Sequence, residues 1–226
     1  MTTAAPTRVT SIELAADTLT PVAAALRLGA RCAFLLESVE GGARYGRYSI
    51  AGVHGRTLVV GDDEDPLEVL RAALPEVEPM GGDPAFPLAS GVGYLSYEAT
   101  ARWERVPIPA ADPLGMPNAV FHLPSSVIVF DHLAQVARVA TLDGPGAEER
   151  LHDVTSALST PAEGEVPATF AVAAVPAERD PDARTRYEEG VAQLVEEIHA
   201  GEMLQAVLAR RFSIPTRRGA LEISLP

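Results

Sequence analysis

The segment CAFLLESVEGGARYGRYSIAG, residues 32–52, constrains the fold of this chain more than any other stretch of its sequence. An apolar run over 32–38 ends in a carboxylate and a hydroxyl, paired glycines follow, and a second β-rich run returns over 47–52. Two such runs around a glycine-containing turn are typical of a β-hairpin. The pattern therefore predicts two adjacent strands with polar residues at their ends.

The rest of the chain contains further strand and helix patterns. Residues 125–143 form the clearest hairpin pattern, with two β-rich runs around Asp131-His132, and residues 56–60 predict a third strand near the first hairpin. Prolines punctuate 107–124, so we expect mostly loop there. Caps and helical spacing predict helices over 21–28, 66–74, 146–159 and 186–198, and further strands are expected at the start of 90–104 and over 203–215.

Residues 159–181 are linker-like, because four prolines with small residues between them interrupt any regular pattern. The chain of 226 residues is therefore expected to have a first part, 1–158, and a second part, 182–226. Its last residues, RGALEISLP, are typical of the first turn of a helix. We accordingly expect the sequence to be the front portion of a longer protein.

Charge and composition exclude several classes of function. The formal net charge of -13 argues against nucleic acid or an anionic membrane as a partner, because phosphate binding needs clustered cations. Every basic residue is an arginine, so the chain has no lysine for Schiff-base chemistry. Cys32 is the only cysteine and the sequence has no long apolar run, which together indicate a soluble cytoplasmic protein.

The residues by themselves indicate no catalytic group and no metal site. The five histidines are scattered without metal-ligand spacing, and no phosphate-binding loop or nucleophile elbow is present. The pair Gly91 and Gly93 is interpreted as part of a strand that another backbone approaches closely.

A small-molecule pocket is the functional hypothesis that the first hairpin suggests. A carboxylate, hydroxyls, a guanidinium and a phenol would meet at its strand ends, and a zwitterionic amino acid needs such a mixture beside an apolar wall. The alternative is a hairpin whose polar residues cap the strand ends, with Arg44 or Arg47 paired to Glu37 or Glu40. The candidate polar residues are Glu37, Ser38, Arg47, Tyr48 and Ser49.

Three motifs in the same order resemble anthranilate synthase component I. The run FLLESVEGGARYGRYSIAG looks like the N-terminal signature of that family, whose Leu-Leu-Glu-Ser segment lines a tryptophan feedback site. The run GVGYLSYEATARWE is similar to a second family segment. The run IHAGEMLQAVLARRFSIP resembles a third, which is shared by the wider chorismate-utilising family. Glu202 stands where that motif usually has an aspartate. Some members of the family have a lysine on the second strand of the tryptophan site. This chain has no lysine, so Arg47 or Tyr48 would take its place.

The resemblance implies a fold, an activity and partners. The family fold is α+β, with antiparallel sheets packed as a sandwich and helices on the outside. The family enzyme converts chorismate to anthranilate and pyruvate, with Mg2+ and with ammonia from a glutamine amidotransferase subunit, and L-tryptophan inhibits it. Half of the tryptophan site would be formed by Leu36, Glu37, Ser38, Arg47, Tyr48 and Ser49.

The same resemblance divides the chain by function. Residues 1–158 would be the regulatory region and 182–226 the start of the chorismate-binding domain, where Gln205 would donate a hydrogen bond behind the substrate pocket. The family's catalytic residues and magnesium ligands would lie beyond residue 226. Two alternatives remain open: another chorismate enzyme such as aminodeoxychorismate synthase, and an amino-acid-binding module without catalysis.

Overall fold

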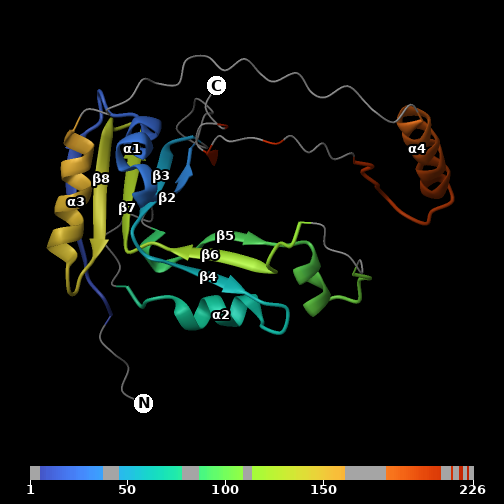
Figure 1. Cartoon of the computed structure of the whole chain (residues 1–226), viewed down its shortest axis with the longest axis horizontal. Coiled ribbons are helices and arrows are strands. Elements are labelled where there is room, and N and C mark those ends of the chain that lie inside the picture. Colours follow the sequence, from blue (N-terminus) through green and yellow to red (C-terminus); the bar gives the residue numbers. More distant parts are fainter. Residues whose placement is uncertain are drawn as a thin grey trace. The chain divides into compact units, whose positions relative to one another are not determined.

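The computed structural model describes residues 6–37, 46–77, 87–108, 114–160 and 182–209, together with 215, 219, 220 and 223. The chain divides between residues 163 and 164 into two compact units, and this division lies inside the linker-like stretch 159–181. Each unit is considered by itself below (Figure 1).

The larger sheet of the first unit contains both predicted hairpins. Its described strands are all antiparallel and lie in the order β1-β8-β7-β3-β2. The two hairpins are confirmed, and β3 pairs with β7, so one hairpin lies directly beside the other. The bounds are β1 (Val9–Ala15), β2 (Cys32–Leu36), β3 (Tyr48–Val53), β7 (Ser126–Asp131) and β8 (Val136–Leu142).

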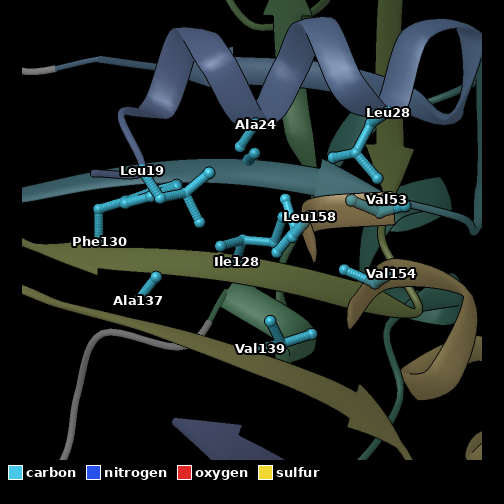
Figure 2. Close-up of a cluster of buried hydrophobic side chains, with 11 residues drawn as sticks. Leu19, Ala24, Leu28, Val53, Ile128, Phe130, Ala137, Val139, Val154 and Leu158 are labelled. Carbon is cyan, nitrogen blue, oxygen red and sulfur yellow. The ribbon is translucent and has the colours of Figure 1, made fainter. Parts of the chain in front are cut away.

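Two helices cover one face of this sheet. Helix α1 (Pro21–Leu28) begins where the Thr20 side chain accepts a hydrogen bond from the Ala23 amide, as its capping pattern predicts. Helix α3 (Ala147–Ser159) runs beside β8 (Figure 1). Figure 2 shows apolar side chains from both helices meeting those of β3, β7 and β8 in a buried cluster. Burial of these side chains holds the helices against the sheet.

The opposite face of the larger sheet carries a second cluster. Leu88, in the short helix η2 (Pro87–Ala89), is buried with Val127, Val129 and Ala140. Alternation along each strand separates the two clusters, because neighbouring side chains point to opposite faces. Two other short helices are η1 (Gly29–Arg31) and η3 (Glu98–Arg102).

A smaller sheet has the described order β4-β6-β5, and helix α2 (Pro66–Ala73) packs on it. Its strands are β4 (Arg56–Val60), β5 (Val92–Leu95) and β6 (Ala119–Leu123). The expectation of a loop over 107–124 is wrong for β6, which is the central strand. Prolines flank this strand at 117 and 124 without entering it, so its backbone amides can pair on both sides.

The two sheets are joined where β3 passes into β4 and β6 passes into β7. His54 and Gly55 make the first passage with positive φ angles of 56° and 113°. The His122 Nε2 atom donates to the His54 carbonyl at 2.9 Å, and the Phe34 ring meets the His122 ring edge-on at 6.0 Å between centroids. These contacts hold the sheets against each other, and the predicted α+β fold with antiparallel sheets and outer helices is confirmed.

The second unit contains helix α4 (Ala183–His199), which Gly201 follows with a φ of 81°. This confirms the predicted helix and its stop. The strand expected over 203–215 is absent from the described residues 203–209, which have no regular structure. No strand is described in this unit that could pair with it, and an unpaired strand is not stable in water. In the described residues of the whole chain, no helix combines the length and apolar character needed to cross a bilayer.

Candidate functional site

The predicted site residues lie at one end of strands β2 and β3. Leu36 is the last residue of β2 and Glu37 follows it, and both are exposed. Arg47 precedes β3, which begins with Tyr48. Ser38 lies outside the described residues.

Arg47 forms a two-pronged ion pair with Asp131, the last residue of β7. The Arg47 Nη2 atom lies 2.7 Å from Asp131 Oδ2, and Nε lies 3.1 Å from each carboxylate oxygen. The guanidinium carbon also lies 4.9 Å from the centre of the Tyr48 ring, in cation–π range. Because an arginine fork matches a carboxylate in both charge and shape, this pair is directional as well as electrostatic.

Ser49 is held by the residue that follows Asp131. Its hydroxyl is fully buried and lies 2.8 Å from His132 Nε2. The His132 backbone amide donates to the Arg47 carbonyl at 2.9 Å. The start of β3 is therefore bound to the β7–β8 turn through a carboxylate, an imidazole and a backbone amide.

The strand pleat places the predicted residues on both faces of the sheet. Leu36 is paired with Ile50, and Tyr48 and Ile50 pack on the cluster that contains Leu88. Ser49 alternates with these residues and belongs to the face covered by helices α1 and α3. Leu36 and Tyr48 can therefore line a common surface, whereas the Ser49 hydroxyl points to the other side.

The partner that the structure shows for Arg47 is a residue that the sequence interpretation did not consider. The local pattern suggested Glu37 or Glu40, whereas the ion pair that the structure describes for Arg47 is made with Asp131, 84 positions away. Asp131 and His132 carried a signal, since they form the turn of the second predicted hairpin. What the pattern lacked was the pairing of β3 with β7, which brings that turn beside Arg47.

The electrostatics of this end of the sheet follow from the ion pair. Hydrogen bonds from Arg47 hold the pKa of the Asp131 carboxyl below its usual range. The backbone amides of Leu133 and Ala134 also donate to Asp131 Oδ1, at 3.0 and 3.1 Å. Asp131 therefore remains ionised near neutral pH and caps its own turn while binding Arg47.

The remaining predicted site residue, Gln205, lies in the second unit. It is exposed in the irregular segment after α4, and its role behind a substrate pocket stays a prediction. Among the described residues of both units, no group of three or more histidines, cysteines, aspartates or glutamates could hold a metal ion.

Comparison with known proteins defines the class of this chain. The family model described as chorismate binding enzyme matches residues 31–224, so the chain belongs to the chorismate binding enzyme family. Anthranilate synthase component 1 of Mycolicibacterium smegmatis is 34% identical over 92% of this chain and 45% of the relative. The protein of that name from Thermus thermophilus is 36% identical over 88% of this chain and 46% of the relative.

A solved structure shares the fold. Anthranilate synthase component I from Streptococcus pneumoniae aligns with a TM-score of 0.51 and 21% identity, over 84% of this chain and 46% of that chain. The chain spans about half the length of these relatives. The match to the family confirms that the three quoted motifs identify a chorismate-utilising protein.

Proposed function

We propose that this chain is the N-terminal part of an anthranilate synthase component I, which converts chorismate and ammonia to anthranilate and pyruvate in tryptophan biosynthesis. The observation that carries the proposal is the similarity to curated proteins of that name across about nine tenths of the chain. The component 1 naming also supports a partner subunit, for which we propose a glutamine amidotransferase that supplies ammonia.

The strand ends of the first unit support a regulatory role. We propose that L-tryptophan binds there, with Leu36 as apolar wall, Glu37 and Ser38 as polar groups, and Tyr48 on the same face as Leu36. Ser49 contributes by fixing β3 from the other face, since its hydroxyl is buried against His132. Arg47 shapes the same strand end through Asp131.

We propose that other parts of the protein carry out catalysis. We propose that Mg2+ serves the whole enzyme by binding the carboxylate of the substrate. The described residues of this chain do not fit a magnesium site, because they contain no cluster of suitable ligands. From the resemblance to the family, we propose that the catalytic groups and the metal ligands lie outside residues 1–226. A reducing compartment such as the cytoplasm fits the single cysteine, Cys32, whose thiol pKa is raised by burial.

The direct test is product analysis with the full-length protein, chorismate, magnesium and ammonia. We expect anthranilate, seen by fluorescence, and pyruvate in equal amounts. Formation of aminodeoxychorismate without pyruvate would contradict the proposal and would favour the related synthase. Residues 1–226 alone should form no anthranilate, and fluorescence from that chain would show that catalytic groups lie within it.

A further inference from the structure

We propose that Asp131 and His132 are positioning residues of the tryptophan site, because they hold the start of β3 from both faces of the sheet. The inference rests on the proposed feedback function and names residues that the hairpin motif itself does not contain. Neither residue needs to touch tryptophan to fulfil this role.

The first observation is that each face of β3 has its own contact with the turn. Tyr48 is paired with Asp131, and the Arg47 guanidinium reaches that carboxylate over the Tyr48 ring. On the helix-covered face, the Ser49 hydroxyl meets His132 Nε2 at 2.8 Å. The side chains of two successive turn residues therefore bind Arg47, just before β3, and Ser49, within β3.

The second observation is that one carboxylate joins the turn to the strand. Asp131 accepts hydrogen bonds from two amides of its own turn as well as from Arg47, and its side chain is only 15% exposed. The turn conformation and the position of Arg47 are therefore coupled. Gln135 completes the turn with a φ of 56°, a conformation that few residues other than glycine adopt readily.

The third observation concerns the site residues at the end of β2. In the described sheet, β2 is an edge strand and its hydrogen-bonded neighbour is β3. Leu36 and Glu37, at the end of β2, therefore take their place in the sheet from β3. Anything that displaces the start of β3 therefore also displaces the end of β2, and loss of such preorganisation weakens binding.

The variant that separates positioning from folding is Asp131→Asn in the full-length protein. An asparagine Oδ1 can still accept from the turn amides, but the charge that pairs with Arg47 is lost. We expect the inhibition constant for tryptophan to rise about tenfold, which corresponds to roughly 1.4 kcal/mol. This rise is expected to exceed any change in KM for chorismate, measured with ammonia as nitrogen donor.

A matched control uses the ion pair between Glu13 and Arg138, which joins β1 to β8 across the sheet from β2. Glu13→Gln breaks that pair, whose N–O distance is 3.0 Å, and should leave the tryptophan inhibition curve unchanged. If Asp131→Asn does not fold, His132→Ala provides the same readout, because His132 is exposed and its imidazole contacts the Ser49 hydroxyl.

The outcomes distinguish the inference from the function on which it rests. A wild-type protein that makes anthranilate without inhibition by tryptophan would overturn the feedback site and the positioning role together. A wild-type protein that tryptophan inhibits, with an unchanged inhibition constant in the folded Asp131→Asn or His132→Ala variant, would overturn only the positioning role. An equal rise for Glu13→Gln would also overturn it, since the effect would then be general destabilisation.

Discussion

The hydroxyl groups of Ser126 and Thr141 lie 2.9 Å apart, fully buried, on directly paired positions of β7 and β8. The Thr141 hydroxyl donates to the Ser125 carbonyl at 3.0 Å and accepts from Arg150 Nε at 3.1 Å. The Ser126 hydroxyl therefore donates to Thr141. Through Arg150 this buried pair connects α3 to the sheet.

Replacing Thr141 by valine should destabilise the first unit although the shape of the side chain is retained. The Ser126 hydroxyl and the Arg150 Nε atom would each lose a buried partner, at a cost of about 1–3 kcal/mol in the free energy of unfolding. Urea unfolding measures this loss. Thr155→Val on α3 is the control. An equal loss of unfolding free energy in both variants would show that the buried Ser126–Thr141 pair is not the cause of the loss.

Gly55→Ala tests the passage between the two sheets. A Cβ atom at this position would lie 2.1 Å from the Leu123 carbonyl oxygen, and the φ angle of 113° disfavours any side chain. We expect a loss of about 2–4 kcal/mol, from backbone strain together with overpacking. Gly146→Ala is the matched control at a φ of 74°, where the nearest heavy atom is 3.5 Å away, and it should cost about 1–2 kcal/mol. Similar melting temperatures for the two variants would contradict the packing argument.

The ion pair of Asp131 should make stability depend on pH in the acid range. Because the pKa of Asp131 is lower in the folded chain than in the unfolded chain, its contribution is present above the unfolded value and is lost as pH falls through the folded pKa. The exposure of Arg47 limits the contribution to about 1 kcal/mol. Urea unfolding of wild type and Asp131→Asn between about pH 6 and pH 3 measures it. The difference between the two proteins should shrink toward acid, and a constant difference would exclude the ion pair as its source.

Ser38→Ala tests direct contact with tryptophan. If the hydroxyl binds the ligand, its loss should cost about 1–3 kcal/mol of inhibitor affinity. Inhibition of the full-length enzyme, with its amidotransferase, should then weaken by about one to two decades. Ser159→Ala, at the exposed end of α3, is the control. An unaltered inhibition curve for Ser38→Ala would return Ser38 to a strand-capping role, and the ligand contacts would then be sought around Arg47 and Tyr48.

Short-range features of this protein were determined by the sequence alone. The glycine-containing turn predicted the β2–β3 hairpin, and the two β-rich runs around Asp131-His132 predicted the β7–β8 hairpin. Capping residues predicted helix starts, since Thr20 and Asp65 each accept hydrogen bonds from amides of the turn that follows. These features depend on residues close together in the chain, so their physical causes are visible in a short stretch of sequence.

Tertiary structure alone decided what surrounds those elements. The pairing of β3 with β7 places Asp131 against Arg47 and His132 against Ser49, and no local pattern specifies which hairpins become neighbours. Burial between two strands likewise makes a strand of Ala119–Leu123 despite the prolines around it. The tertiary structure also decides which faces Tyr48 and Ser49 occupy. Alternation places the two side chains on opposite faces, but the buried clusters on each side of the sheet determine which residue belongs to which face.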